Sequence, residues 1–333
     1  MQANNDEDAA KGIVSIEDGT FVVTAGLDGI QAETMFAVSG GNITVSSGGG
    51  SSAAPEGIMG VVESAKGLKA GVDVNISGGN IQVDSADDAV HSNGSITIGG
   101  GELVLASGDD GVHADTSLQI YGGDLTIAQS YEGLESAVIV INDGTINLVA
   151  SDDGINVTGG SDGSGLQEPG IDSFSSSGDR YLEINGCLII IYATGDSIDA
   201  NGPATMNGGT VVINGPLAPG GGNGMLDVDG SLTISGGLLA AVGSTGMGIN
   251  INGASTQYAV RHSLPATQAA DTTIHIVSAD GQDVVTYTPA TEYQTILVSA
   301  PGFDNGATYL VYASDEQVSS FTIGGVVTGE TGR

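Results

Sequence analysis

A tight glycine turn recurs along this chain and limits what the chain can fold into. The glycine returns at intervals of 21 to 23 residues, apart from longer intervals of 28, 38 and 42 residues. A fixed period of this size is the signature of stacked repeats, so each long interval indicates one period plus an inserted loop. The marker glycines are Gly19, Gly41, Gly79, Gly101, Gly123, Gly144, Gly186, Gly209 and Gly237.

Apolar residues occupy fixed columns around each marker glycine, three and five residues before it and two, four and eleven residues after it. The alternation on either side of the glycine predicts two short strands per coil, and the last position predicts a second buried corner. Around Gly101 the columns hold Ile98, Ile96, Leu103, Leu105 and Val112, and around Gly186 we expect Ile184, Leu182, Leu188 and Ile190.

One coil cannot bury these side chains alone, but stacked coils bury them in continuous aliphatic ladders. The sequence therefore predicts an all-β fold, a right-handed parallel β-helix of about nine coils of roughly 22 residues. Three inward-facing segments per coil favour this helix over the calcium-binding roll, whose nonapeptide signature is absent.

The period predicts the domain organisation. Residues 1–254 are assigned to the β-helix, with loop insertions at 49–65, 159–179 and 214–223. After about residue 255 the period is lost and strand patterns with an Asp-Gly hairpin signal follow, so 255–333 is predicted to be a small C-terminal β element, either a cap or a β-sandwich. The first residues fall in the middle of a coil, which suggests a fragment or end-to-end self-association through that coil.

Carboxylates recur at one corner of the predicted stack, nine residues after the marker glycine. Asp-Asp-Gly is a good turn, but Asn or Ser would make the same turn without stacking like charges about 4.8 Å apart. A bound Ca²⁺, which takes about six to eight oxygen ligands, would resolve the repulsion. This acidic column holds Asp28, Asp88, Asp110, Glu132 and Asp153, with Asp196 after a one-residue shift; the metal candidates are Asp87, Asp88, Asp109, Asp110, Asp115, Glu132, Asp152 and Asp153.

A second polar column follows three residues beyond the acidic column and supplies candidates for contacting a sugar. His91 and His113 fall side by side in it, which raises Zn²⁺ as a rival metal, although the oxygen-rich setting favours Ca²⁺. Aromatic platforms are scarce, and Tyr121 is a further candidate. The carbohydrate-binding candidates are Lys69, His91, His113, Tyr131, Glu135 and Asn156.

Two of the six basic residues, Lys66 and Lys69, lie in "AKGLKAG" on the same corner. Lys66 occupies the position in its coil that Asp88 occupies in the next coil. We therefore expect Lys66 to relieve the negative charge of the acidic column. The functional alternative is a cation for an acidic sugar, or a general base with a pKa lowered by a nearby metal.

The amino-acid composition limits the kinds of partner that this protein can bind. The 333 residues carry 40 Asp plus Glu against 6 Lys plus Arg, a formal charge of −34, so nucleic acid and anionic membranes are poor partners. Hydrophobic residues make up 40%, which is normal for a folded chain. There is one cysteine, no apolar run long enough to span a membrane and no signal sequence.

Several consecutive motifs carry a family resemblance, namely "NDEDAAKG", "GLDGIQAET", "KGLKAG", "SADDAVHSNG", "SGDDGVHAD", "SYEGLES" and "ASDDGIN". From Asn5 to about Phe321 the chain resembles bacterial secreted proteins with a carbohydrate-binding domain. The resemblance implies a fold similar to β-helical polysaccharide lyases, bound Ca²⁺, plant cell-wall polysaccharides as partners and a secreted or cell-surface location. The residues that the resemblance implicates are chiefly Asp87, Asp88, Asp109, Asp110, Glu132, Asp152 and Asp153. The chain departs from the pattern at Ala89 and in "NGCLIII".

Three functions remain open at this point. The first is Ca²⁺-dependent, non-catalytic binding of a polysaccharide, acidic and pectin-like or cellulosic, through the acidic column. The second is a polysaccharide lyase with Lys66 or Lys69 as the base. The third is a structural surface or filament subunit stacked end to end.

Overall fold

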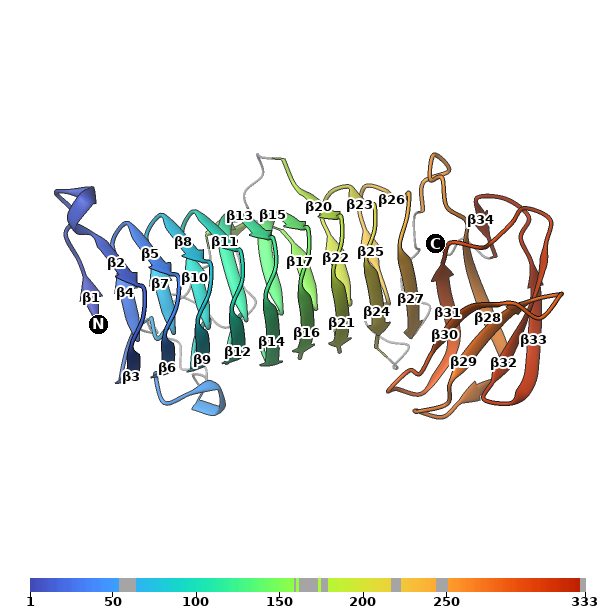
Figure 1. The fold of residues 1–333 in the computed structure, drawn as a ribbon, viewed down its shortest axis with the longest axis horizontal. Helices are drawn as coiled ribbons and strands as arrows, with labels where there is room; N and C mark the ends of the chain where they lie inside the picture. Colours follow the sequence, from blue (N-terminus) through green and yellow to red (C-terminus); the bar gives the residue numbers. More distant parts are fainter. Residues whose placement is uncertain are drawn as a thin grey trace.

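The computed structural model describes residues 1–53, 64–158, 160–161, 173–174, 179–216, 223–243 and 251–329. These residues form an all-β protein, as predicted, in which the only helices are two short 3-10 turns, η1 (Ala9–Lys11) and η2 (Ser51–Ala53). The strands stack along one long axis, from the N-terminus at one end to residues 259–328 at the other (Figure 1). Among the described residues, no helix has the length and apolar character needed to cross a membrane.

Three runs of parallel strands make up the stack, and each coil contributes one strand or half-strand to a run. Face 1 holds β1 (Gln2–Ala3), β4 (Ile30–Ala32), β7 (Leu68–Ala70), β10 (Val90–Ser92), the starts of β13 (Val112–Ile120) and β15 (Leu134–Ile141), β17 (Ile155–Val157), β22 (Ile198–Ala200) and β25 (Asp227–Val228). Face 2 holds β2 (Ile13–Ile16), β5 (Met35–Val38), β8 (Asp73–Ile76), β11 (Ser95–Ile98), the ends of β13 and β15, β20 (Tyr181–Ile184), β23 (Ala204–Met206) and β26 (Leu232–Ile234). Face 3 holds β3 (Thr20–Ala25), β6 (Asn42–Ser47), β9 (Asn80–Ser85), β12 (Glu102–Ser107), β14 (Asp124–Gln129), β16 (Thr145–Ala150), β21 (Leu188–Ala193), β24 (Thr210–Asn214) and β27 (Leu238–Gly243).

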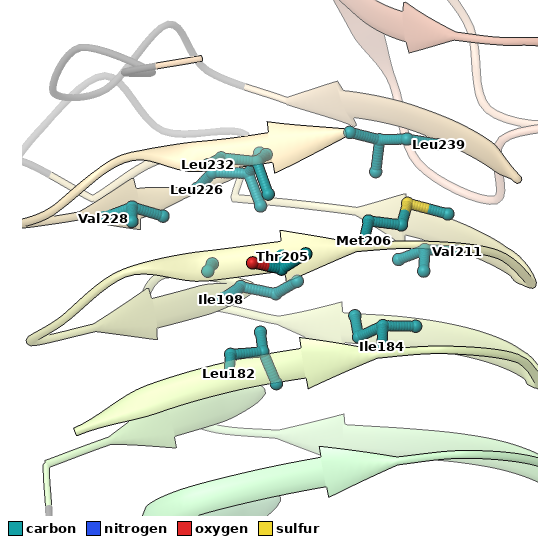
Figure 2. Close-up of a pocket in the computed structure, with 11 residues that line it drawn as sticks. Leu182, Ile184, Ile198, Thr205, Met206, Val211, Leu226, Val228, Leu232 and Leu239 are labelled. Atoms are coloured by element: carbon teal, nitrogen blue, oxygen red, sulfur yellow. The ribbon is translucent and has the colours of Figure 1, made fainter. Parts of the chain in front are cut away.

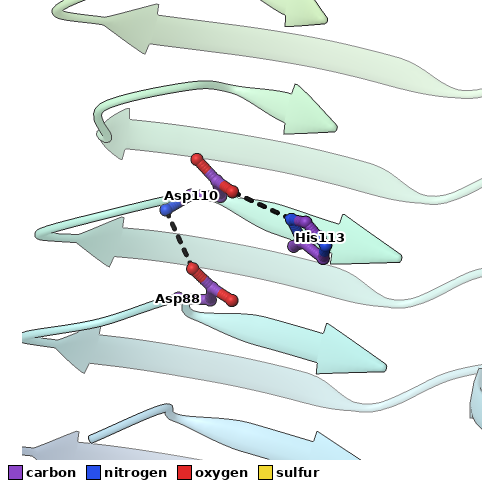
Figure 3. A group of neighbouring side chains, drawn as sticks. All are labelled: Asp88, Asp110 and His113. Carbon is purple, nitrogen blue, oxygen red and sulfur yellow. Dashed lines mark hydrogen bonds and ion pairs between the residues drawn. The ribbon is translucent and has the colours of Figure 1, made fainter. Parts of the chain in front are cut away.

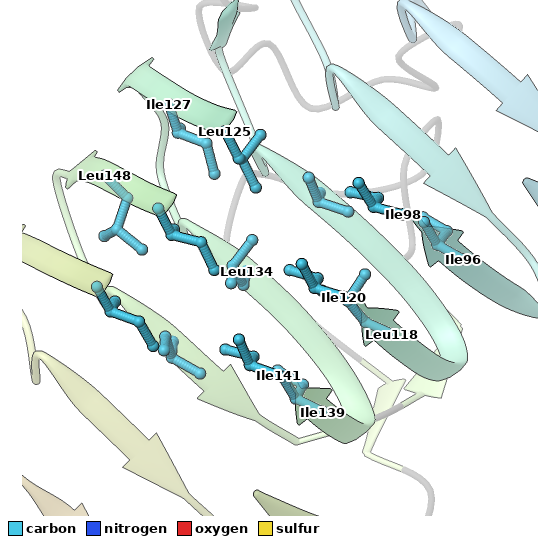
Figure 4. Close-up of a cluster of buried hydrophobic side chains, with 14 of the residues drawn as sticks. Ile96, Ile98, Leu118, Ile120, Leu125, Ile127, Leu134, Ile139, Ile141 and Leu148 are labelled. Atoms are coloured by element: carbon cyan, nitrogen blue, oxygen red, sulfur yellow. The ribbon is translucent and has the colours of Figure 1, made fainter. Parts of the chain in front are cut away.

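The register between coils places equivalent residues on top of one another. Ile96 pairs with Leu118 and Leu118 with Ile139, all with 0% exposure. Figure 4 shows these aliphatic side chains pointing into the space between the faces, with members of successive coils side by side. Each fully buried aliphatic side chain stabilises the fold by about 1.5–3 kcal/mol, so the ladders hold the coils together.

The marker glycines allow the coils to approach closely at the turn between faces 2 and 3. Gly101 has a φ of 103°, and a Cβ there would lie 3.0 Å from the carbonyl oxygen of Gly79 in the preceding coil. Gly186, which the sequence analysis took as a marker, is not the turn residue. In that coil Cys187 adopts the left-handed conformation, with a φ of 100°.

The shift to Cys187 corrects two core assignments. Leu188 and Ile190 were expected to face inward, but Leu188 is 37% exposed, whereas Ile189 and Ile191 are fully buried. Counting from Cys187 removes the one-residue shift of Asp196, which then lies nine residues after its marker like the other acids. The prediction failed because it required a glycine where the fold accepts a small strained side chain.

A small cavity of about 20 Å³ lies in the core of the later coils (Figure 2). Ala204 lines it, at a position where the stacked residues on either side are Leu182 and Leu232. The shorter side chain leaves space that a larger aliphatic residue fills in the other coils.

The C-terminal strands continue face 3 instead of leaving its last strand open. β31 (Tyr293–Ser299) pairs antiparallel with β27, and β28 (Ala259–Gln268) pairs with β31 and with β34 (Val327–Thr328). A second sheet contains β29 (Ile274–Ser278), β30 (Asp283–Tyr287), β32 (Thr308–Ala313) and β33 (Glu316–Thr322). It packs on a core that is distinct from that of the coils and to which β27, β28 and β31 also contribute. The boundary at residue 254 stays a prediction.

The three expected insertions fall partly outside the described residues. Of the stretch 49–65, residues 54–63 lie outside; of 159–179, only 160–161, 173–174 and 179 are described; and of 214–223, residues 217–222 lie outside. The described part of the second stretch forms an antiparallel pair of β18 (Gly160–Ser161) and β19 (Ser173–Phe174), and β18 contacts β13.

Candidate functional site

The acidic column lies at the corner where the chain passes from face 3 to face 1. The turn forms there because a small residue follows the column residue, a glycine in most coils and Ala89 or Ser197 in two others, and the first buried residue of face 1 comes next. Lys66 occupies the column between Asp28 and Asp88, as the sequence indicated. The column therefore contains one cation among its acids.

Several column carboxylates bind the backbone of the next coil. Asp88 Oδ1 accepts a hydrogen bond of 3.1 Å from the amide of Asp110 (Figure 3). The same bond runs from Lys66 N to Asp28 Oδ1, from Asp196 N to Asp153 Oδ1 and from Gly224 N to Asp196 Oδ1. These bonds give the repeated acid a structural role that Asn could also fill.

Lys66 forms a buried ion cluster with the acidic pair one coil further along. Its Nζ lies 2.9 Å from Asp87 Oδ1 and also binds Asp88 Oδ2, while the Lys66 side chain is 1% exposed and that of Asp88 is 0% exposed. Two carboxylates around a buried ammonium group stabilise its charged form. This geometry matches the charge-relief interpretation and does not suit a general base.

The two histidines of the second polar column stack on one another, with ring centroids 5.2 Å apart. His91 Nδ1 lies 2.8 Å from Asp88 Oδ2, and His113 Nδ1 lies 3.0 Å from Asp110 Oδ2, so each ring binds the acid of its own coil. The second contact is drawn in Figure 3. Both histidines are at most 3% exposed, which places them inside the corner.

The pKa values of His113 and Asp110 are both raised in this corner. Burial lowers the pKa of His113, but the charge of Glu135 and hydrogen bonds with Asp110, Asp115 and Glu135 outweigh burial and raise that pKa well above its ordinary value. Burial, with the charges of Glu135 and Asp109, raises the pKa of Asp110 well above its ordinary value. Without a bound metal ion, both groups therefore hold their protons more tightly than they would in water.

One group of three carboxylates is suited to a hard metal ion. Asp110, Glu132 and Glu135 are all buried, and one oxygen from each lies within 4.8 Å of the others. Asn156 Nδ2 donates a 2.7 Å hydrogen bond to Glu132 Oε2, whereas the buried Asn156 Oδ1 has no hydrogen-bond partner among the described residues. An all-oxygen set with a further oxygen nearby fits Ca²⁺.

Two other groups meet the same distance criterion among the described residues. Asp87, Asp88 and Asp109 form one, although Lys66 already neutralises its first two members. Asp88, Asp110 and His113 form the other, and its imidazole nitrogen is the ligand that Zn²⁺ prefers. Oxygen donors suited to Ca²⁺ and an imidazole donor suited to Zn²⁺, the two metals considered from the sequence, thus both occur in this corner.

The column continues toward the C-terminus with partly buried acids. Burial raises the pKa of Asp153 to about 8, with a further contribution from the charge of Asp152. Burial likewise raises the pKa of Asp196 to about 6, and burial with the charge of Asp196 raises the pKa of Asp199 to about 7. Acids in this state release protons when a cation binds.

The carbohydrate candidates divide by exposure. His91, His113, Glu135 and Asn156 are buried, with exposed fractions of 1–6%, while Lys69 and Tyr131 are partly exposed. Lys69 Nζ lies 3.4 Å from Asp28 Oδ2 and donates a 3.0 Å hydrogen bond to Ser64 Oγ. Burial, then a hydrogen bond with Asp152, raises the pKa of Tyr131.

Two further metal candidates lie at the edges of the cluster. Asp115 Oδ1 lies 3.3 Å from His113 Nε2 and is buried, and Asp109 is partly exposed beside Asp110. Sequence reasoning did not assign Glu135 to the metal group. The signal was its position, because Glu135 stacks on His113 in the second column.

Comparison with known proteins yields one match. Residues 1–111, a third of the chain, match the model of a family described as "Carbohydrate-binding domain-containing protein". The matched stretch is similar to that family and includes Lys66, Asp88 and Asp110. No curated protein and no solved structure matches the chain.

Proposed function

We propose that this protein is a non-catalytic, Ca²⁺-dependent polysaccharide-binding protein, built on a right-handed parallel β-helix and secreted or held at a cell surface. The observation that carries the proposal is the buried group Asp110, Glu132 and Glu135, which brings together acids of two adjacent coils. The similarity of residues 1–111 to a carbohydrate-binding family supports a polysaccharide as the partner.

The proposed role of Ca²⁺ is to make an acidic protein compatible with an acidic polymer. At a formal charge of −34 the chain would repel a uronate polymer. Ca²⁺ at the corner neutralises protein carboxylates and offers its remaining coordination positions to uronate oxygens. The partly exposed Asp109, Asp152, Tyr131 and Lys69 are then the side chains available to the glycan.

The test is calorimetric titration of polygalacturonate into the protein with Ca²⁺ and with EDTA. We expect binding only with Ca²⁺. A Glu135→Gln variant should bind Ca²⁺ about tenfold or more weakly, because it removes a ligand charge. The matched control, Glu102→Gln, changes an exposed carboxylate on face 3 and should leave the affinity unchanged. Polygalacturonate binding that EDTA does not alter would contradict the proposal, and Zn²⁺ binding with no Ca²⁺ binding would reassign the metal.

The lyase alternative has weaker support. Lys66 is held in a buried ion pair, so Lys69, with a partly exposed side chain beside Asp28, is the only base of the two that a substrate reaches in this structure. A rise in unsaturated-product absorbance on polygalacturonate with Ca²⁺, abolished in Lys69→Ala, would establish the lyase. We expect no rise.

The filament alternative meets a structural obstacle. β31 pairs antiparallel with the last parallel strand of face 3, so that end does not offer β27 as an edge to another copy. Self-association through the N-terminal coil stays a prediction. Light scattering over a range of protein concentrations tests it.

A further inference from the structure

A groove of about 360 Å³ opens beside the C-terminal half of the acidic column. Its floor comes from the ends of three adjacent strands of face 3, where Val149 stacks on Tyr192 and Tyr192 stacks on Asn214. Its far wall includes Thr291, which precedes β31 in the C-terminal element. Because the period of the coils does not extend to the C-terminal element, only the folded chain brings these residues together.

The groove combines apolar surface with a few polar groups. Val149 is 45% exposed, and alanine and proline side chains lie around it beside the ring of Tyr192. Thr291 Oγ1 is shielded from solvent and has no hydrogen-bond partner among the described residues. A buried hydroxyl without a partner is unfavourable, so a ligand hydroxyl that bonded to it after rotation of the Thr291 side chain would gain affinity.

The wall of the groove is held in place by a specific contact. Asn214 Oδ1 accepts a 2.9 Å hydrogen bond from the amide of Ala290, the residue before Thr291. This bond ties the C-terminal element to the stack at the groove itself. The position of Thr291 relative to Tyr192 is therefore set before any ligand arrives, which lowers the entropy cost of binding.

Charge selects the kind of ligand. None of the lining residues that the structure describes carries a charge, and the column acids Asp152 and Asp196 follow two residues after Ala150 and Thr194 of the lining. A uronate carboxylate in the groove would be desolvated and repelled by those acids. A neutral pyranose ring has an apolar C–H face for the tyrosine and hydroxyls for the threonine and asparagine side chains.

We propose that the groove lined by Val149, Tyr192, Asn214 and Thr291 is a second, metal-independent subsite that binds a neutral pyranose unit. This inference rests on the proposed polysaccharide function and extends it, because it assigns the neutral sugars of a mixed polymer to a place apart from the Ca²⁺-bridged uronates. The groove and the column then lie along one edge of the stack, next to one another in the same coils.

The experiment measures calorimetric binding of cellohexaose, xylohexaose and hexagalacturonate in EDTA. We expect a neutral hexasaccharide to bind without metal. Tyr192→Ala should weaken that binding about tenfold, a loss of about 1.4 kcal/mol, and Tyr192→Phe should retain it because the ring face remains. Thr291→Val gives a second variant that removes only the hydroxyl and should weaken binding severalfold.

Tyr181→Ala is the matched control, since Tyr181 is partly exposed on face 2 and lies outside the groove. It should bind as the unmodified protein does, and melting curves should show all variants folded. No binding of either neutral hexasaccharide, or equal binding by Tyr192→Ala, would overturn the inference. Failure of the proposed Ca²⁺-dependent function would show in the separate polygalacturonate titration, as binding that is absent or that EDTA does not change. The neutral hexasaccharide titrations in EDTA are independent of that result.

Discussion

The ammonium group of Lys66 lies 2.9 Å from a carboxylate oxygen of Asp87 in the next coil, and Lys66 is 1% exposed. The same nitrogen binds Asp88, which has no exposed surface. A lysine thus neutralises the acidic pair at this point of the acidic column. The neutralised part of the corner ends at Asp88, and the group suited to a metal begins at Asp110.

Replacement of Lys66 by Met should destabilise the protein by about 3–5 kcal/mol, because it leaves buried carboxylates without their cation. Chemical denaturation in EDTA measures this loss. Lys11→Met is the control: Lys11 also lies 2.9 Å from an acid, Asp8, but its side chain is 69% exposed. An exposed pair contributes about 0–1 kcal/mol, so equal losses in the two variants would contradict the buried ion cluster.

Stability without metal should fall as the pH rises. Burial raises the pKa of Asp196 to about 6, of Asp199 to about 7 and of Asp153 to about 8, whereas unfolded aspartate titrates near 4. The folded state holds these protons more tightly, so their contribution to the free energy of unfolding is fully present below about pH 4 and is lost as the pH rises through about 6 to 8.

Melting curves in EDTA across this range provide the measurement. Asp199→Asn should flatten the decline, because its amide stays neutral at every pH. Asp6→Asn, which alters an exposed acid, should leave the profile as it was. A metal-free protein that gains stability between pH 5 and pH 8 would refute the expectation.

Ca²⁺ should raise the melting temperature, and more at pH 8 than at pH 5, since the ligands must lose their protons first. At a concentration 100 times its Kd, a bound ion adds about 2.7 kcal/mol to the free energy of unfolding. Scanning calorimetry with Ca²⁺ and with EDTA tests this. Glu132→Gln should reduce the shift, and an identical melting temperature in both buffers would argue against a folded-state metal site.

Ala204→Val should stabilise the protein by about 0.5–2 kcal/mol, because its methyl groups enter the cavity of about 20 Å³ between Leu182 and Leu232. Ala114→Val tests whether the gain comes from the cavity. Ala114 is fully buried and does not line this cavity, so overpacking there should cost about 1–3 kcal/mol. Denaturant midpoints for both variants decide the matter; stabilisation by both would point to another cause.

Cys187→Gly should also stabilise the fold, by about 0.5–1 kcal/mol, because the left-handed φ of 100° strains any residue with a Cβ. The opposite change, Gly209→Ala, should be destabilising. A Cβ at Gly209 would lie 2.8 Å from the Cys187 carbonyl oxygen. If Cys187→Gly lost stability, packing of the thiol would outweigh the backbone strain.

The repeat made much of the fold predictable. The columns around the marker glycines predicted the inward residues of most coils, and the vertical alignment of Asp88 with Asp110 and of His91 with His113 follows from their spacing of 22 residues alone. The pattern of glycines does not predict that Cys187, and not Gly186, is the turn residue of its coil, since a sequence pattern cannot show backbone conformation. It also gave no account of the groove at Tyr192, because Thr291 lies beyond the last coil.

The sequence by itself determined the stack and the placement of acids on one corner, since a period of about 22 residues with in-register pairing fixes which residue lies above which. Only the tertiary structure decided what those acids do. The pairing of Lys66 with Asp87, the burial of His113 and Glu135, and the closure of face 3 by β31 depend on side-chain reach and on chain segments outside the repeat. A periodic pattern sets the register of the coils along the axis. How deeply each side chain is buried, and which charged group it pairs with, depend on how the side chains pack around the stack.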